Sequence, residues 1–191
     1  MIETKEHLID VQPLRTKKQI EDMKWALKRF CSERDYILFL IGINTGLRSS
    51  DILKLKVSQI QSLSRKKRKI FIVKEGKTKK ERIINLNSIY DEVFDYSKFV
   101  DSEWLFPSRK GDKPISVVQA WRILNKAGSF AEIDSIGTHT MRKTFGYWFY
   151  KQTHDVAMLQ EILNHSSPSI TLRYIGINDE EINNTLDDFR L

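Results

Sequence analysis

The sequence lacks the features of disulfide-bonded, secreted and membrane-spanning proteins. Its 191 residues include a single cysteine, Cys31. One cysteine excludes an internal disulfide framework and is typical of a reducing compartment, so we expect a cytoplasmic protein. No apolar run is long enough to cross a bilayer, and residues 1–6 do not open a signal peptide, so we expect no membrane partner. With 40% apolar and 30% charged residues, the chain is most simply one globular domain with a sizeable core.

The residue patterns of metal-dependent and nucleotide-dependent enzymes are also missing. The four histidines, at positions 7, 139, 154 and 165, form no His-Glu-x-x-His pair, and one cysteine cannot build a zinc knuckle. Gly76-Lys77-Thr78 resembles the end of a phosphate-binding loop, but position 71 is Phe where the full pattern requires Gly. Asp187 and Asp188 are adjacent and would point in different directions on a helix, which does not suit two-metal chemistry. We therefore expect no metal and no cofactor.

Positive charge is present in excess and is unevenly spread. The net charge is +7 and the isoelectric point is near 9.4. Residues 65–82 contain ten Lys and Arg against Glu75 and Glu81, whereas residues 179–188 are rich in Asp and Glu. Taken alone, the basic run is explained as well by a solvated loop as by a binding surface. Beside the phosphate-directed residues described below, it favours a nucleic-acid partner.

Helical periodicity covers most of the chain. Thr16 and Gln19 match a capping box that precedes apolar residues at helical spacing. Ser32 is predicted to cap a second, largely buried helix that ends at Gly46, and Ser49 is predicted to begin a short third helix. Further helices are predicted at residues 88–99, 116–127, 139–152, 155–163 and 179–189.

Two short apolar segments, residues 69–73 and 82–86, predict a β-hairpin whose turn carries several of the lysines. Residues 104–106, before Pro107, indicate a weaker third strand or a loop. The predicted fold class is α+β, mostly helical with a small antiparallel three-stranded sheet. We expect a flexible lead-in over residues 1–15, a main domain over 16–178 and a C-terminal helix over 179–191.

Five residues outside the hairpin point to one chemistry. Arg48 lies at a predicted helix junction, and the last third of the chain supplies His139, Arg142, His165 and Tyr174. Two guanidiniums can bind the non-bridging oxygens of a phosphate, and imidazoles can hydrogen-bond these oxygens or move protons. A phenol with a pKa of ~10 is a weak nucleophile that needs such positive neighbours. This set of groups suits a tyrosine that attacks a phosphodiester without a metal.

Each of these residues also has an ordinary structural explanation. A tyrosine among apolar neighbours is usually a core residue, and a His-x-x-Arg pair usually lies on a helix surface. His165 could cap the preceding helix, and Arg48 could pair with Asp51, three residues further on. The catalytic interpretation is favoured because all of these residues occur together in one short chain.

These motifs resemble those of the tyrosine recombinases, the phage integrase family of site-specific recombinases. The resemblance rests on residues 45–51, 76–82, 139–145 and 163–166 together with Tyr174. The spacing agrees as well, because Arg142 precedes His165 by 23 residues and His165 precedes Tyr174 by nine. The similarity covers roughly residues 16–178, which it identifies as the catalytic domain.

The resemblance implies a role for each site residue. Tyr174 would attack the scissile phosphate, leaving a 3′-phosphotyrosyl link and a free 5′-hydroxyl. Arg48 and Arg142 would bind the non-bridging oxygens and stabilise the transition state. Rejoining would be the reverse attack by a 5′-hydroxyl, so neither ATP nor a metal is implied.

The remaining roles concern protons. Lys77 on the hairpin would protonate the departing 5′-oxygen, with Lys79 as the alternative because the register of a lysine-rich turn is ambiguous. His139 would assist proton transfer, and His165 would hydrogen-bond the phosphate. The lysines and arginines of residues 65–69 would contact phosphates or form a solvated hairpin edge.

The sequence departs from the family pattern at several positions. Asn164 stands where Gly is usual and is expected to tighten the turn before His165. Asp51 replaces a common Glu and is expected to orient Arg48, and Lys143 replaces a frequent His. Family members usually carry a further N-terminal helical domain that closes around DNA, and no residues of this chain correspond to it. The chain would then be a domain of a longer protein or a short form, with weak DNA affinity.

The predicted C-terminal helix has an apolar face of Ile182, Leu186 and Phe189. This face would pack on its own domain or, as the family suggests, on a neighbouring subunit of a homotetramer on DNA; a monomer would exist without DNA. The leading hypothesis is a DNA recombinase acting on double-stranded DNA. The alternatives are nicking and resealing like that of type IB topoisomerases, and a DNA-binding remnant or regulator that does not cleave.

Overall fold

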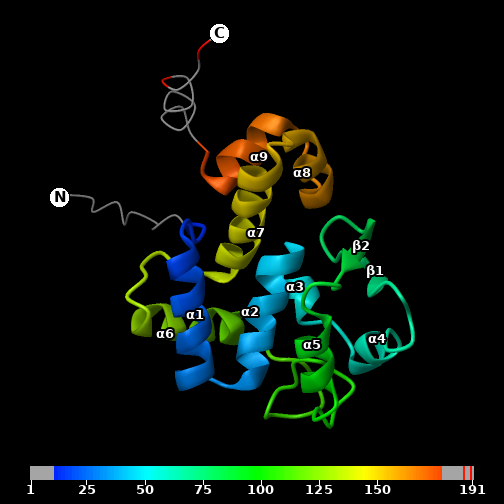
Figure 1. Cartoon of the computed structure of the whole chain (residues 1–191). Coiled ribbons are helices and arrows are strands. Elements are labelled where there is room, and N and C mark those ends of the chain that lie inside the picture. The colour runs from blue at the N-terminus through cyan, green and yellow to red at the C-terminus, as the bar shows by residue number, and fades with distance from the viewer. Residues whose placement is uncertain (1–10, 178–186, 188–189, 191) are drawn as a thin grey trace, which may run out of the picture.

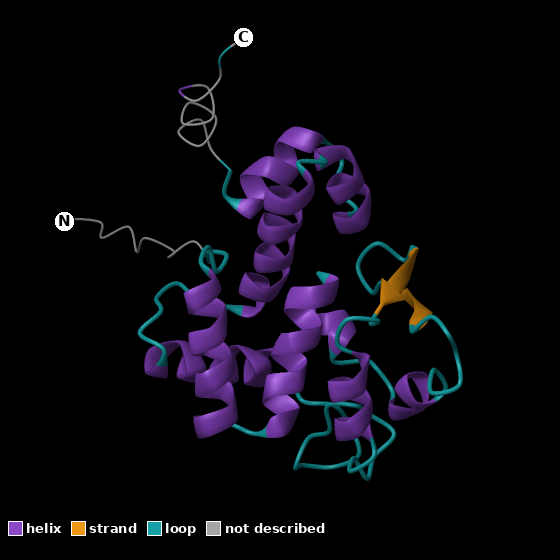
Figure 2. Ribbon diagram, viewed as in Figure 1, coloured by secondary structure: helices purple, strands orange, loops and turns teal. Residues whose placement is uncertain are grey.

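The described part of the chain is mostly helical and carries one β-hairpin (Figures 1 and 2). The computed structural model describes residues 11–177, 187 and 190. In chain order the elements are α1 (Lys17–Phe30), α2 (Glu33–Thr45), α3 (Ser49–Ile52), α4 (Val57–Gln61), β1 (Ile70–Lys74), β2 (Glu81–Asn85), α5 (Tyr90–Ser97), α6 (Val117–Phe130), α7 (Thr138–Thr153), α8 (Val156–Leu163) and α9 (Pro168–Ile175). None of the described helices is long and apolar enough to span a membrane.

Helices α1 and α2 begin where the sequence predicts, and α2 also ends where it predicts. Thr16 Oγ1 accepts a hydrogen bond from the backbone N–H of Gln19 at 3.1 Å, and Gln19 Oε1 accepts one from the N–H of Thr16 at 3.2 Å, which confirms the capping box. Ser32 is the N-cap of α2. Gly46 ends this helix with a φ of 60°, a left-handed conformation that favours glycine.

Helix α2 lies at the centre of the fold and packs against α1, α5 and α7. Its contact with α7 is close: a Cβ at Gly42 would lie 2.5 Å from Met141 Sδ, which leaves no room for a side chain there. Beyond this contact, the C-terminal half of α7 joins α8 and α9 around a second, smaller apolar core (Figure 1). The fold therefore has a large core around α2 and a small one around α8 and α9, with α7 passing between them.

The predicted hairpin is confirmed, whereas the prediction of a third strand is wrong. Strands β1 and β2 pair antiparallel from Ile70 opposite Asn85 to Lys74 opposite Glu81, and within the described residues this sheet has two strands. Trp104 instead forms a single bridge with Lys56, and the carbonyl of Phe106 accepts one hydrogen bond from the N–H of Ile115. Leu105 and Phe106 are fully buried there, and Pro107, which lacks an N–H, cannot continue a ladder.

Other segments differ from the expectations or lie outside the described residues. Helices α4 and α9 were not among the predicted elements; α9 begins with Ser167 as N-cap and Pro168 in its first turn. Within the expected lead-in, Leu14 is buried, and its backbone N–H donates to Thr144 Oγ1 on α7 at 2.9 Å. Residues 1–10, and all of the predicted helix over 179–189 except residue 187, lie outside the described part.

Candidate active site

The predicted site residues gather where α2, α7, α8, α9 and the hairpin turn approach one another. Arg48 follows α2, while His139 and Arg142 lie on the first turns of α7. His165 follows α8, and Tyr174 lies near the end of α9. Figure 1 shows α7 running from α2 toward α8 and α9, which is how residues from both apolar cores reach one place.

Arg142 is held by the ends of two helices. Its side chain is 3% exposed. Nη1 donates to the carbonyl of Gly46 at 2.6 Å, and Nη2 donates to the carbonyl of Leu163 at 2.5 Å. Carbonyls at helix C-termini lack intrahelical partners and carry the negative end of the helix dipole, so they attract a guanidinium. The ends of α2 and α8 thus fix the orientation of Arg142.

Arg48 pairs with Glu75 rather than with Asp51. Arg48 Nη1 donates to Glu75 Oε2 at 2.8 Å, and its side chain remains 17% exposed. Asp51 Oδ1 instead accepts a hydrogen bond from the backbone N–H of Gly76 at 2.9 Å, which ties the hairpin turn to α3. The expectation that Asp51 orients Arg48 is therefore wrong, since its carboxylate positions the turn.

Glu75 and Arg82 were missed as site residues. The fully buried Glu75 carboxylate has Oε1 3.6 Å from Arg82 Nη1 and 3.9 Å from Arg142 Nη1, in addition to its bond with Arg48. Arg82 also donates to the carbonyls of Thr45 and Gly46. The available signal was an acidic residue next to the Gly-Lys-Thr string within a strongly basic run.

The ionisation of these groups follows from their mutual contacts. Burial would raise the pKa of Glu75, but the hydrogen bonds from Thr78 and Arg48 outweigh burial and lower that pKa, so the group is a carboxylate. Burial and the nearby Arg142 lower the pKa of Arg82 to about 10, so it stays charged at neutral pH. The pKa of Arg142 is also lowered, chiefly by burial.

Tyr174 has an imidazole within hydrogen-bonding distance of its hydroxyl. Tyr174 Oη lies 3.2 Å from His139 Nδ1. Burial raises the pKa of Tyr174, whereas Arg142 and Arg48 oppose this shift. Burial, followed by the charges of Arg142, Lys143, Arg48 and Lys77, lowers the pKa of His139. A neutral imidazole therefore faces a protonated phenol, which is the pairing that a general base requires.

His165 lies edge-on to the Tyr174 ring, with the ring centroids 4.9 Å apart. Its Nδ1 is 3.2 Å from Thr171 Oγ1, and that hydroxyl donates to the carbonyl of Ser167 at 3.2 Å. Because the hydroxyl proton is used there, Thr171 accepts from His165, which leaves the His165 Nε2 lone pair free in the neutral form. Burial and the charges of Arg142 and Arg48 lower the pKa of His165 to about 4.

Lys77 lies at the exposed tip of the hairpin turn, and its positive charge contributes to the lowered pKa of His139. Lys80, by contrast, donates to Asn164 Oδ1 at 3.0 Å. Asn164 has a φ of 57° and caps α8, which confirms that it tightens the turn before His165. Its Nδ2 lies 3.4 Å from Glu75 Oε2 and 3.4 Å from Thr78 Oγ1, so Asn164 also joins α8 to the hairpin.

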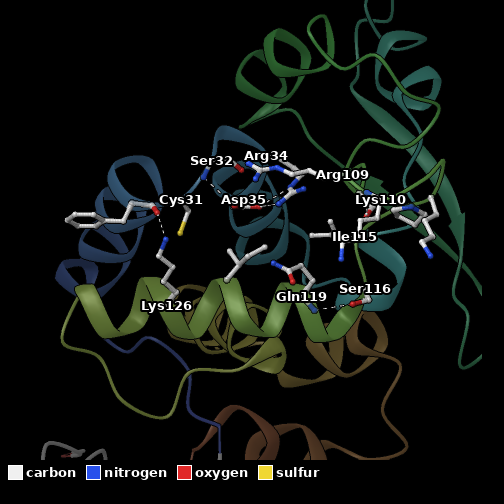
Figure 3. A pocket seen from close by; sticks show the side chains of 15 residues that line it. Cys31, Ser32, Arg34, Asp35, Arg109, Lys110, Ile115, Ser116, Gln119 and Lys126 are labelled. Atoms are coloured by element: carbon white, nitrogen blue, oxygen red, sulfur yellow. Dashed lines mark hydrogen bonds and ion pairs between the residues drawn. The ribbon is translucent and has the colours of Figure 1, made fainter.

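A cavity of about 710 Å³ lies at the other end of α2 (Figure 3). It is lined by the residues around the N-terminus of α2, by residues 108–110 and 113–116, and by α6. None of the six predicted site residues is among its described lining residues. Within the described part, moreover, no three His, Cys, Asp or Glu side chains gather where they could hold a metal ion. The site is thus a cluster of arginines, histidines and a tyrosine outside this cavity.

Comparison with known proteins identifies the family of this chain. Residues 15–181 match the phage integrase family. This chain belongs to that family, the tyrosine recombinases. The probable integrase/recombinase YoeC of Bacillus subtilis is 48% identical over 172 residues, covering 89% of this recombinase and 92% of YoeC. The tyrosine recombinase XerA of Thermococcus onnurineus is 27% identical over 164 residues, and the match spans 56% of its length.

Solved structures show the same fold. The crystal structure of XerA recombinase has a TM-score of 0.74 at 22% identity, covering 94% of this recombinase and 67% of that chain. A lambda integrase dimer bound to a COC′ core site has a TM-score of 0.69 at 17% identity, covering 88% of this recombinase and 61% of that chain. The predicted fold class is therefore confirmed, apart from the third strand.

Proposed function

We propose that this protein is a site-specific DNA recombinase that cleaves and rejoins duplex DNA through a 3′-phosphotyrosyl intermediate. The carrying observation is the 3.2 Å contact between Tyr174 Oη and His139 Nδ1, beside the buried guanidinium of Arg142. A nucleophile, a neutral base and a fixed cation thus adjoin one another, as attack on a phosphodiester requires.

In the first step Tyr174 Oη attacks phosphorus and the phenol proton passes to His139. The bond from phosphorus to the 5′-oxygen breaks, and Lys77 supplies the proton that this oxygen takes up. Arg48 and Arg142 stabilise the negative charge that gathers on the non-bridging oxygens. The negative charge of the bound phosphate favours the protonated imidazole, so His165 Nε2 takes up a proton from solvent and donates a hydrogen bond to the same phosphate. The reverse reaction, with a 5′-hydroxyl as nucleophile, releases Tyr174 and restores the phosphodiester.

We further infer that the working assembly is a homotetramer on DNA. One structural neighbour is a lambda integrase tetramer bound to a Holliday junction, with a TM-score of 0.68 over 88% of this chain. Sedimentation of the protein with duplex carrying its site should give a complex of four subunits and two duplexes. A complex that never exceeds one subunit per site would contradict the tetramer but not cleavage.

Nicking and resealing without strand exchange is a second candidate function. The observation in its favour is that Tyr174 Oη lies 3.2 Å from His139 Nδ1 of the same chain, so the nucleophile and its base meet within one protomer. Relaxation of a supercoiled plasmid without recombinant products would favour this function. The presence of all six predicted site residues also argues against a non-cleaving regulator.

The decisive experiment traps the covalent intermediate. The protein is incubated with a pool of nicked duplexes of random sequence, from which the 5′-leaving strand diffuses away, and adducts are separated on a denaturing gel. We expect an adduct with the wild-type protein and none with Tyr174→Phe, which keeps the ring but lacks the hydroxyl. If neither protein forms an adduct with any duplex in the pool, the proposed chemistry is wrong.

A further inference from the structure

The carboxylate of Glu75 contacts all three arginines of the site. Arg48 Nη1 lies 2.8 Å from one oxygen, and Arg82 and Arg142 lie 3.6 and 3.9 Å from the other. We propose that Glu75 is a positioning residue for cleavage, which aims Arg48 at the scissile phosphate and holds the Lys77 turn in register with it. This inference rests on the proposed recombinase chemistry and adds to it a residue that does not touch DNA.

Burial shows that Glu75 acts through other groups. The side chain is 0% exposed, whereas that of Arg48 is 17% exposed. A DNA phosphate can therefore reach Arg48 but cannot reach the carboxylate behind it. One Arg48 nitrogen is engaged by Glu75, and because the guanidinium is a rigid planar fork, fixing one nitrogen fixes the direction of the remaining donors.

The carboxylate also balances charge in a way that suits the reaction. Three guanidiniums in a half-buried cluster repel one another, and Glu75 reduces their combined charge to +2. A phosphodiester carries one negative charge, and the pentacoordinate transition state carries two. The cluster with Glu75 therefore matches the transition state, and without Glu75 it would have excess positive charge and less fixed geometry.

The same residue closes the turn that carries Lys77. The backbone N–H of Glu75 donates to the carbonyl of Lys80 at 2.9 Å, and the N–H of Lys79 donates to the carbonyl of Glu75 at 3.0 Å. The side chain accepts from Thr78 Oγ1 at 2.8 Å. Lys77 thus lies in a turn that Glu75 closes by bonding to residues on its opposite side. The proposed acid Lys77 and the phosphate-binding Arg48 are therefore both positioned by Glu75.

The test separates positioning from general stability. Single-turnover cleavage of a nicked duplex, and affinity for the same duplex, are measured for wild type, Glu75→Gln, Arg48→Ala and the double variant. We expect Glu75→Gln to cleave about 10²-fold more slowly, the scale of a misplaced transition-state donor, with DNA affinity unchanged or higher. In the Arg48→Ala background the same substitution should slow cleavage by only about tenfold, because the part of its effect that passes through Arg48 is absent there and the part that passes through the Lys77 turn remains.

A matched control is Glu81→Gln, the same substitution at an exposed carboxylate on strand β2 of the same hairpin. It should cleave within about twofold of wild type, since surface changes have small effects. The proposal is overturned if Glu75→Gln cleaves like the control, if its loss is equally large in the Arg48→Ala background, or if affinity and rate fall together.

Failure of the underlying chemistry is distinguishable from failure of this inference. If the wild-type protein forms no adduct, the proposed function fails, and the positioning claim is then tested on melting temperatures of the same four proteins. Anchoring of Arg48 by Glu75 predicts that the double variant melts no lower than Glu75→Gln alone. Melting-temperature losses that simply add would show that the two side chains are independent and would overturn the proposal.

Discussion

The two ends of helix α2 are both basic, yet they are built differently. At the C-terminal end the guanidinium of Arg142 is 3% exposed and bonded to the carbonyls of Gly46 and Leu163. At the N-terminal end the cations of the cavity include Arg109 and Lys110, which are exposed on a loop (Figure 3). Arg34 at the cavity is also fixed, but it is paired with Asp35 and bonded to the carbonyl of Pro107. At the C-terminal end the fixed guanidiniums instead belong to the cluster that contains Tyr174. Fixed direction is what stabilises a transition state, because no reorganisation is needed during the reaction.

The largest effect on cleavage should come from a substitution that keeps the positive charge of a side chain but removes its fixed set of hydrogen-bond donors. Arg142→Lys keeps a cation but cannot bond two helix-end carbonyls and a phosphate at once. We expect single-turnover cleavage to fall by about 10³-fold. Arg109→Lys at the cavity is the matched control and should stay within about twofold of wild type. Near-normal cleavage by Arg142→Lys would show that charge alone suffices at the C-terminal end.

The next largest effect on cleavage should come from Lys77, which is as exposed as the lysines of the cavity but is proposed to supply a proton. Lys77→Ala should lower the cleavage rate by about 10²-fold, the scale of a lost general acid. A substrate with sulfur in place of the bridging 5′-oxygen should restore the rate, because a thiolate leaves without a proton. Lys79→Ala, on the same turn, should behave like wild type. Rescue of Lys79→Ala rather than Lys77→Ala would reverse the assignment.

A smaller effect is on the pH dependence of stability, which we expect to involve the C-terminal end of α2 and not the cavity. The pKa of His165 is lowered from 6.5 to about 4, and that of His139 is lowered as well. Between pH 6.5 and 4 the unfolded chain therefore binds protons that the folded protein does not, so the free energy of unfolding decreases as the pH falls through this range. His165→Gln should reduce the difference in melting temperature between neutral and mildly acidic pH.

The cavity supplies the control for this pH effect, because its described lining contains no histidine. Lys126→Gln should therefore leave the difference in melting temperature as it is in the wild type. An unchanged difference in His165→Gln would mean that His165 does not titrate differently in the folded and unfolded states.

The smallest effect is on salt dependence. Residues 65–68 are exposed and basic, and we expect them to contact DNA phosphates. Replacing these four side chains with Gln should flatten the plot of log affinity against log salt by ~0.9 for each phosphate that the protein no longer neutralises. Lys110 and Lys113 at the cavity, changed in the same way, should leave the slope unaltered. Equal slopes for both variants would remove the distinction between the two basic regions.

Much of this arrangement is predictable from local sequence. Capping by Thr16, the end of α2 at Gly46 and the hairpin all follow from signals within a few residues. The site residues follow from spaced motifs whose residue types suit one reaction.

Contacts between distant segments were not predictable in the same way. Arg48 lies three residues from Asp51 and 27 residues from Glu75, and it pairs with the more distant carboxylate. Residues 104–106 are apolar enough for a strand, but their neighbours in space are the segment around Lys56, far earlier in the chain, and the loop around Ile115. Hydrophobic periodicity predicts the type of a single helix or strand, so it does not predict which other segment that element packs against.

The small core around α8 and α9 holds Tyr174 apart from the large core, because Tyr174 lies on α9. Tyr147, Leu159 and Ile175 belong to this core and not to the large one. A cooperative opening of this unit would withdraw Tyr174, His165 and one carbonyl anchor of Arg142 in a single event. Arg48 and the strands of the hairpin, which pack on the large core, would remain in place, while the hairpin turn would lose its contacts with Asn164. The protein would then still hold DNA while having no nucleophile to cut it.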